Sequence, residues 1–597
     1  MKITVALKIC VTLIVLPLTT EAFSSAPLTR TVVPIRQAAR LTVNPSRNTG
    51  VFPSPVSSTQ LQVARVGKLS STRDQTARKP KEETVTSENA TTPIFEGFGK
   101  GARRDFAARL PLYGSDIKDG LNVQSLAATL FLVFACLAPA VGFGGLYHSA
   151  TGGAIGTVEM ILSTAMGGVL YHLTAAQPLT IIGATGPVVA FTACLAQIAK
   201  MMSLPFLPLY AWTGLWSSGI LMLASLTSAS NLVKYLTRFT DEIFSTLIST
   251  IFIVEAFTDV AGAFGTTSLT KAFLTLSIAS MTYMMSSTLK KVRKSPYFTK
   301  RIRKTISNFA PTIGVVTACL TARYFKLKHG AAVAGLPSLV IPATFGTTTG
   351  RPWLVPLLDL PVWARWAAFL PALMATVLLF LDQNITVRLV NNPRWKMNKG
   401  RKEGNVLDGM HADMFVLSIL TALQSVTGLP WLVAATVRSL SHVGALTKTD
   451  ENTGKVVGTH EQRVTGVAIH ALIGCTIFLS KPRQLLTQVP MPVLMGLFMY
   501  MGVSSLPGNE MWERFLGLFH DKTVAQEKRW TNKVPPRMVK RLTYVQLACL
   551  GAMFWVKESP IGVLFPILVA LLAPIRFGLE RFNTIPKAYM DVLDAEE

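Results

Sequence analysis

Apolar segments long enough to cross a lipid bilayer recur along this chain from about residue 122 to residue 580. A helix needs about 20 apolar residues to span the hydrocarbon core. The 597-residue chain is 50% hydrophobic and only 15% charged, whereas a soluble protein carries about 25% charged residues. These features predict an all-α polytopic membrane protein.

About fourteen spans can be delimited, and basic residues cluster in the short loops between them. The loop from Lys290 to Lys304 holds eight basic residues and no acid, and the loops near residues 394–402 and 522–541 are also basic. Loops rich in Lys and Arg normally stay on the inner side of the membrane. The three basic loops all fall on that side if there are fourteen spans and the N-terminus is inside, so they support both the number of spans and the orientation. The same clustering accounts for the net charge of +26 without a nucleic-acid partner. The predicted spans are residues 122–147, 157–175, 178–200, 206–230, 241–262, 271–289, 306–325, 361–390, 410–427, 430–446, 463–480, 489–506, 541–557 and 559–580.

The N-terminal region has the composition of a targeting sequence. Residues 1–22 hold two lysines and an apolar core, as a signal peptide does. Residues 23–75 are transit-like, since Phe23 to Arg73 contains seven basic residues and no acid. The combination resembles the bipartite presequence of algae with complex plastids and predicts a plastid membrane, either envelope or thylakoid. The alternative is an ordinary signal followed by a disordered tail, with the protein in the plasma membrane.

Two predicted spans are interrupted by glycine and proline at corresponding positions. The third is broken at Pro178 and again between Gly183 and Pro187, and the tenth opens with Gly428 and Pro430. The third and tenth spans lie seven spans apart. They therefore occupy corresponding positions if the fourteen spans form two inverted repeats of seven. Paired breaks of this kind point to a binding site between the repeats. The predicted organisation is a polar linker at 76–105, a first membrane repeat at 106–325, a linker at 326–360, a second membrane repeat at 361–580 and a tail at 581–597.

One arginine, Arg438, lies inside the short apolar segment that follows the second break. An arginine at membrane depth costs at least about 2.5 kcal/mol and normally faces a cavity or a partner. Helix N-termini carry about half a positive charge, so two half-helices beside Arg438 would form an anion site. The alternative is an arginine whose head reaches the lipid phosphates. The other predicted anion-binding residues are Thr436, Val437, Ala435, Thr185, Gly186 and Pro187.

Acidic residues are rare in the spans. Asp382 and Thr386 share a helix face in the eighth span and offer oxygen ligands for sodium, or a proton acceptor. The alternative is a solvated acid at a helix end. Glu242 and Glu255 are candidates for lining a cavity. His442, four residues after Arg438, is a candidate for tuning the anion site or for a structural hydrogen bond.

Several kinds of chemistry have no support in the sequence. The six cysteines lie in apolar stretches without metal or redox spacing. No glycine-rich phosphate loop, nucleophile elbow or His-Glu-x-x-His motif is present. We therefore expect no enzyme, no cofactor and no metal other than a transported sodium ion.

Motifs across residues 109–580 together resemble the bicarbonate-transporting anion exchanger family, which includes the red-cell anion exchanger and its sodium-coupled relatives. The most specific are Gly-Leu-Pro-Trp through Ala-Ala-Thr-Val-Arg-Ser and Glu-Gln-Arg-Val-Thr-Gly. The matching stretches are residues 109–119, 137–145, 176–187, 238–244, 428–446, 461–466 and 500–503.

The resemblance implies a core domain (spans 1–4 and 8–11) that moves against a gate domain (spans 5–7 and 12–14), with substrate between spans three and ten. It implies bicarbonate transport and a homodimer. The family's large soluble N-terminal domain has no counterpart among the roughly 105 residues before the match. Arg438 resembles the chloride/bicarbonate exchangers, whereas Asp382 with Thr386 resembles the sodium-coupled members. We expect sodium-coupled uptake, with sodium-independent chloride exchange as the alternative; a borate transporter or a non-transporting receptor ranks lower.

Overall fold

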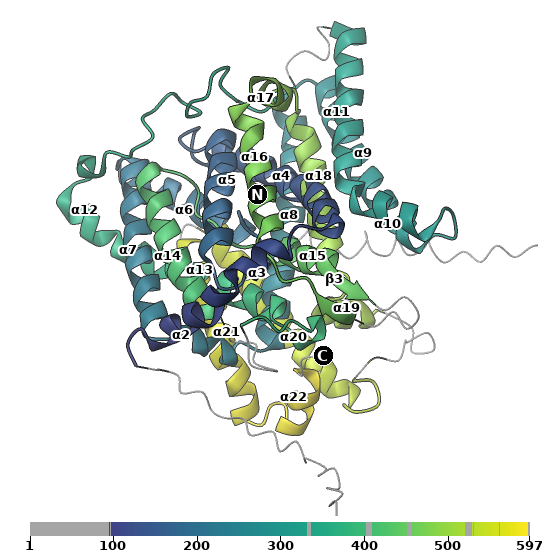
Figure 1. Cartoon of the computed structure of the whole chain (residues 1–597). Helices are drawn as coiled ribbons and strands as arrows, with labels where there is room; N and C mark the ends of the chain where they lie inside the picture. Colours follow the sequence, from purple (N-terminus) through teal and green to yellow (C-terminus); the bar gives the residue numbers. More distant parts are fainter. Residues whose placement is uncertain are drawn as a thin grey trace, which may run out of the picture. The chain divides into compact units, whose positions relative to one another are not determined.

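The computed structural model describes residues 95, 97–330, 336–400, 409–449, 456–519, 528, 530–559 and 562–594. The predicted signal peptide and transit-like presequence lie outside these residues. Helices dominate throughout, as Figure 1 shows. The elements of the first part are α2 Lys100–Arg109, η1 Leu110–Leu112, α3 Tyr113–Lys118, α4 Val123–Ala150, α5 Thr157–Thr174, β1 Ile182–Gly183, α6 Gly186–Met201, α7 Phe206–Leu226, η2 Ala229–Tyr235, α8 Arg238–Thr266, α9 Leu269–Lys291, η3 Val292–Lys294, α10 Lys300–Asn308 and α11 Ala310–His329.

The second part repeats the pattern of long helices with one short strand before a shortened helix. Its elements are η5 Leu357–Asp359, α12 Val362–Ala367, α13 Phe369–Val390, η6 Pro393–Trp395, α14 Met410–Thr427, β2 Val433–Ala434, α15 Thr436–Leu446, β3 Thr447–Thr449, β4 Val456–Thr459, α16 Val464–Phe478, α17 Ser480–Leu486, α18 Met491–Ser505, α19 Glu510–Gly517, α20 Pro536–Glu558, η7 Gly562–Leu564, α21 Phe565–Arg581 and α22 Lys587–Leu593.

Every segment predicted as a span contains a helix in the structure. Among the described helices, α4, α7, α8 and the stretch Val362–Val390 are individually long and apolar enough to cross a membrane. Two sharply bent pairs, α16 with α17 (84°) and α18 with α19 (81°), raise that number from four to six if each pair is one span. The full count of fourteen therefore stays a prediction.

The helices pack in pairs that are distant in sequence. α14 lies along α7, α16 lies along α5 and α4, and α18 contacts α8 and α9. In Figure 1, α9 and α11 run side by side, and they contact each other closely. A large apolar core joins α4, α5, α6, α13, α14 and α16. These contacts bring the two interrupted segments, β1–α6 and β2–α15, into one layer.

The structure adds elements that the sequence pattern did not predict. Four short strands form two antiparallel pairs, β1 with β2 and β3 with β4, so the prediction of helices alone is incomplete. Helix α2 begins inside the predicted 76–105 linker, and α22 lies in the predicted tail. α2 is short and strongly charged, so it lacks the apolar run by which the other helices were predicted.

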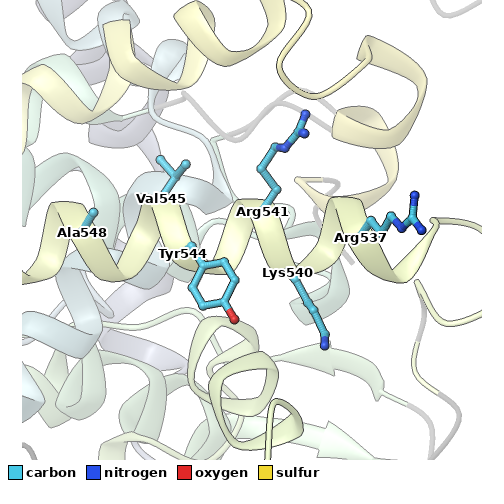
Figure 2. A pocket seen from close by; sticks show the side chains of 6 residues that line it. All are labelled: Arg537, Lys540, Arg541, Tyr544, Val545 and Ala548. Atoms are coloured by element: carbon cyan, nitrogen blue, oxygen red, sulfur yellow. The ribbon is translucent and has the colours of Figure 1, made fainter.

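The start of α20 is basic, in agreement with a loop predicted to lie inside. Figure 2 shows Arg537, Lys540 and Arg541 on its first turns, with Tyr544 following. Lys540 and Tyr544 point to one side of the helix, and Arg541 points to the other. There Arg541 Nη1 donates a hydrogen bond of 2.7 Å to the carbonyl oxygen of Thr584. Basic and aromatic side chains at a helix end are typical of the membrane–water interface.

Helix α2 is attached to α14 through a buried carboxylate. Asp105 Oδ2 accepts hydrogen bonds from the backbone N–H groups of His411 (3.0 Å) and Ala412 (3.3 Å), at the start of α14. Phe106 packs edge-on against Phe415. Burial raises the pKa of Asp105 from 3.8 to about 7, although Arg104 and the two amides act in the opposite direction.

The raised pKa of Asp105 predicts a pH-dependent stability. The folded state binds this proton more tightly than the unfolded state, so the contribution of Asp105 is fully present below about pH 4 and is lost as the pH rises through about 7. Asp105→Asn keeps an acceptor oxygen but removes the titration. Melting temperatures of the purified protein between pH 5 and pH 8 should fall less in the variant than in the wild type. Parallel curves would contradict this assignment.

Candidate functional site

Two non-helical stretches meet in the interior, one before α6 and one before α15. α14 ends at Gly428, whose φ of 63° lies in the left-handed region. A Cβ at that position would lie 2.8 Å from Arg351 Nη2, so both backbone and space favour glycine. The chain then runs without helix to Ala435 before α15 begins. The stretch before α6 runs from Ala175 to Thr185 in the same way.

The two breaks satisfy each other's backbone. β1 and β2 pair antiparallel, with Ile182 opposite Ala434 and Gly183 opposite Val433. The N–H of Ala435 donates to the carbonyl oxygen of Ile181 at 2.8 Å. Because no water in a bilayer core can satisfy such groups, an interrupted helix at membrane depth has to find its partners inside the protein.

Trp431 anchors the stretch before α15. It is fully buried and stacks on Tyr210 with ring centroids 4.2 Å apart and an interplanar angle of 9°. Its indole N–H donates to Ser425 Oγ at 2.9 Å, and its backbone N–H donates to the Tyr210 hydroxyl at 3.0 Å. That hydroxyl donates in turn to the carbonyl oxygen of Leu429 at 3.1 Å. α7 therefore holds the irregular chain through one aromatic pair.

Two buried glutamines complete this support. Gln424 Oε1 accepts a hydrogen bond from the N–H of Leu432 at 3.2 Å, and Gln383 Oε1 accepts one from the N–H of Ala434 at 3.0 Å. Gln383 also donates to the Tyr171 hydroxyl at 2.9 Å. Sequence reasoning missed both residues. Gln383 is adjacent to Asp382, and its polarity at membrane depth was the available signal.

His442 and His470 hold the stretch before α6. His442 Nδ1 lies 2.9 Å from the carbonyl oxygen of Leu179, and its Nε2 lies 2.6 Å from Thr465 Oγ1. His470 Nε2 lies 3.4 Å from the carbonyl oxygen of Ile182. For His442 the contacts favour the structural role over anion tuning. His470 was not predicted, because its own segment reads as an ordinary apolar helix.

Arg438 reaches from α15 across to the stretch before α6. Its Nη2 donates to the carbonyl oxygen of Ala184 at 2.5 Å. Its Nη1 is buried and has no hydrogen-bond partner among the described residues. A Cβ on Gly183 would lie 2.5 Å from Nη1, so the guanidinium rests directly on that glycine. The head group is held inside the protein, which argues against the alternative of a side chain extended to the lipid phosphates.

Asp382 lies on α13 beside the same junction and is only 4% exposed. Its Oδ2 accepts a hydrogen bond of 2.8 Å from Thr185 Oγ1. One turn on, Thr386 Oγ1 shares a hydrogen bond of 2.6 Å with Thr436 Oγ1 and donates to the carbonyl oxygen of Ala434 at 3.3 Å. Within the described chain, Asp382 and Arg438 form no ion pair with each other or with any other residue. A positive and a negative group thus share one junction without neutralising each other by contact.

The remaining predicted anion-site residues fall into two groups. Ala435, Gly186 and Pro187 are buried at the starts of α15 and α6. Val437 differs, because its side chain is 67% exposed and does not pack in the junction.

The two glutamates predicted as possible cavity residues are engaged elsewhere. Glu242 forms ion pairs with Arg238 (3.1 Å) and with Arg514, and it accepts a hydrogen bond from Gln546 at 3.0 Å. Glu255 pairs with Lys557 at 2.8 Å. These partners come from α8, α19 and α20, so the structure does not bring either glutamate into the α6–α15 junction.

An aromatic cluster lies next to the start of α6. Phe143 of α4, Phe252 of α8 and Phe498 of α18 pack with ring centroids 5.6 to 5.8 Å apart. A Cβ on Gly186 would lie 3.2 Å from Phe252. The resemblance assigns α4 to the core domain and α8 and α18 to the gate domain. The cluster therefore joins one helix of the expected core domain to two helices of the expected gate domain.

The contact between Gly183 and Arg438 yields a prediction. In Gly183→Ala the new methyl group displaces the guanidinium, a flexible side-chain end, so the protein should fold normally. If the chain takes up bicarbonate, as the resemblance implies, losing one charge-assisted hydrogen bond should raise the bicarbonate concentration for half-maximal uptake about tenfold. Gly444→Ala on the same helix is the matched control, because nothing lies within 4 Å of its Cβ position. Equal half-saturation values in both variants would contradict the placement of Arg438.

The chain is similar to known proteins over most of its length. A family model described as the HCO3- transporter integral membrane domain matches residues 96–272 and 266–597. The electroneutral sodium bicarbonate exchanger 1 of Rattus norvegicus is 34% identical over 565 residues, covering 81% of this chain and 50% of that protein. The band 3 anion transport protein of Mus musculus is 32% identical over 503 residues, covering 80% and 53%. The chain spans about half the length of the curated relatives it matches.

Solved structures show the same fold at low sequence identity. The transmembrane domain of a cyanobacterial bicarbonate transporter aligns with a TM-score of 0.51 at 13% identity, over 75% of this chain and 98% of that one. The murine solute carrier 26 family member A9 anion transporter, in the inward-facing state, aligns with a TM-score of 0.52, over 85% and 74%. These likenesses confirm the fold of a helical membrane transporter. The family model, which covers nearly all of the described residues, establishes that this chain belongs to the HCO3- transporter integral membrane domain family.

Proposed function

We propose that this protein is a secondary active transporter that moves bicarbonate across a membrane by alternating access. The observation that carries the proposal is Arg438, whose buried Nη1 has no partner among the described residues while its Nη2 rests on Ala184. Bicarbonate is small, planar and singly charged, which suits a guanidinium fork. The N-termini of α6 and α15 add positive potential beside it.

Sodium coupling is the favoured form of this transport. Asp382, Thr185, Thr386 and Thr436 bring a carboxylate and three hydroxyl groups to one side of the junction. Such hard oxygen ligands suit sodium, and the absence of an ion pair between Asp382 and Arg438 leaves each group for its own ion. The similarity to the electroneutral sodium bicarbonate exchanger 1 supports this form of transport. Sodium-independent chloride/bicarbonate exchange is the alternative, and the similarity to band 3 supports it.

Arg438→Ala tests the anion site. Removing the guanidinium should lower uptake of labelled bicarbonate into proteoliposomes by about 100-fold or more, because a buried charge contact is lost. The melting temperature should change little, since the side chain makes one hydrogen bond within the described chain. Arg323→Ala, an exposed arginine on α11, is the control. Wild-type uptake in Arg438→Ala would refute the site, and no uptake by the wild type with any ion present would refute transport.

Asp382→Asn separates the two coupling modes. If Asp382 holds sodium, wild-type uptake should be stimulated by a sodium gradient, and the variant should lose that stimulation while it still binds bicarbonate. Asp591→Asn, an exposed acid on α22, should behave as the wild type. Uptake that responds to a chloride gradient alone would favour the exchanger. Equal sodium stimulation in Asp382→Asn would show that this carboxylate is not a sodium ligand.

We also propose a plastid membrane location, where the transporter would supply inorganic carbon for photosynthesis. The support is the acid-free basic segment after Phe23. Residues 1–75 fused to a fluorescent protein should enter the plastid of an alga with a complex plastid, and Phe23→Ala should abolish import. Secretion of the fusion would instead indicate the plasma membrane.

A homodimer is expected from the family resemblance, and cross-linking in mild detergent that yields only monomer would contradict it.

A further inference from the structure

A concave pocket lies away from the α6–α15 junction. Its volume is about 600 Å³. The turn before α4, the segment after η6 and the β3–β4 hairpin line it, and all three belong to the side predicted to be inside. These segments adjoin α4, α13 and α15, the helices that surround Arg438 and Asp382. The proposed transport does not use this pocket.

The acidic residues of the pocket are already compensated. Asp119 pairs with Lys399 at 2.7 Å, and that hydrogen bond is the main reason the pKa of Asp119 is lowered. Glu461 Oε1 accepts hydrogen bonds from the backbone N–H groups of Asn398 (2.6 Å) and Lys399 (2.8 Å), and Arg109 pairs with its Oε2 at 3.5 Å. These carboxylates are therefore already paired with protein groups and form part of the pocket lining.

Three lysines of the pocket have no side-chain partner within the part of the chain that the structure describes. Lys118, Lys396 and Lys448 line the pocket and are exposed. In the part of the chain that the structure describes, none of them forms an ion pair or a hydrogen bond through its side chain. They come from three different segments, so the fold itself brings them together. Three uncompensated positive charges in one concavity favour a ligand with more than one negative charge.

Two further observations concern residues of the pocket. Burial and the neighbouring Lys448 lower the pKa of His460, which also lines it. Lys396 has φ of 48° and ψ of 52°, a left-handed conformation that non-glycine residues rarely adopt. Strained backbone at a polar concavity is a recognised sign of a functional position.

We propose that this pocket binds a phosphate monoester. Such a group carries about 1.5 to 2 negative charges at pH 7 and has three strong acceptor oxygens, which match the three lysine ammonium groups. Lysine binds phosphate as a point charge and does not require a planar fork. The volume also leaves room for the organic part of a small ester. The source is either a soluble phosphorylated metabolite or a lipid headgroup of the adjoining leaflet.

Binding to the purified full-length protein tests the proposal without any transport measurement. Labelled glycerol 3-phosphate in equilibrium dialysis probes the soluble source. The melting temperature in nanodiscs with and without phosphatidic acid probes the lipid source, since a ligand that binds only the folded state stabilises it. A positive result in the first arm assigns a soluble ester, and a positive result in the second arm alone assigns a lipid headgroup.

The double variant Lys396→Gln with Lys448→Gln should weaken whichever interaction is found by about tenfold or more. Lys533→Gln with Lys540→Gln, which also removes two exposed lysines near the predicted inner face, should change it less than about twofold. The proposal is overturned if neither ligand binds the folded protein, if the pocket variant binds as the wild type does, or if both variants lose binding equally.

Lys396→Gly removes the possibility that lost binding reflects misfolding. Glycine adopts the left-handed conformation without strain, so this variant should melt at the same temperature as the wild type or higher, while its affinity for the phosphate ester still falls. Retained affinity in Lys396→Gly would show that the Lys396 ammonium group does not contact the ligand.

Discussion

The structure depends on one constraint, which is that the backbone of two interrupted helices has to be satisfied where lipid surrounds the protein. An unpaired backbone group costs several kcal/mol in hydrocarbon. Here the two breaks pair with each other as β1 and β2. Their antiparallel pairing places the starts of α6 and α15 side by side. The two interrupted segments, which occupy corresponding positions in the two halves of the chain, therefore lie next to each other in space.

Buried polar side chains then fix that meeting point from several directions. Gln383 and Gln424 hold the stretch before α15, while His442 and His470 hold the stretch before α6. Each of these four side chains forms a hydrogen bond with a backbone group of the junction. Arg438 and Asp382 are two charged groups at this junction that form no ion pair within the described chain. Such groups are costly at membrane depth unless a bound ion compensates them, which is the physical basis for the proposed transport site.

The basic pocket extends the same reasoning to the predicted inner face. Asp119, Glu461 and Lys399 compensate one another, whereas Lys118, Lys396 and Lys448 do not have partners in the described chain. The pocket is built from segments next to α4, α13 and α15. A phosphate ester bound there would contact segments that lead into the helices that carry the junction.

The sequence by itself determined the helical segments, the two breaks and the identity of Arg438 and Asp382 as candidates. Apolar length, glycine and proline are local signals, and a charge inside an apolar segment is conspicuous. Only the tertiary structure decided that Glu242 and Glu255 form ion pairs outside the junction, that His442 is a hydrogen-bonding support, and that Val437 is exposed. It also revealed Gln383, His470 and the three-lysine pocket. Those roles depend on contacts between segments that are distant in the sequence, and a local sequence pattern does not predict such contacts.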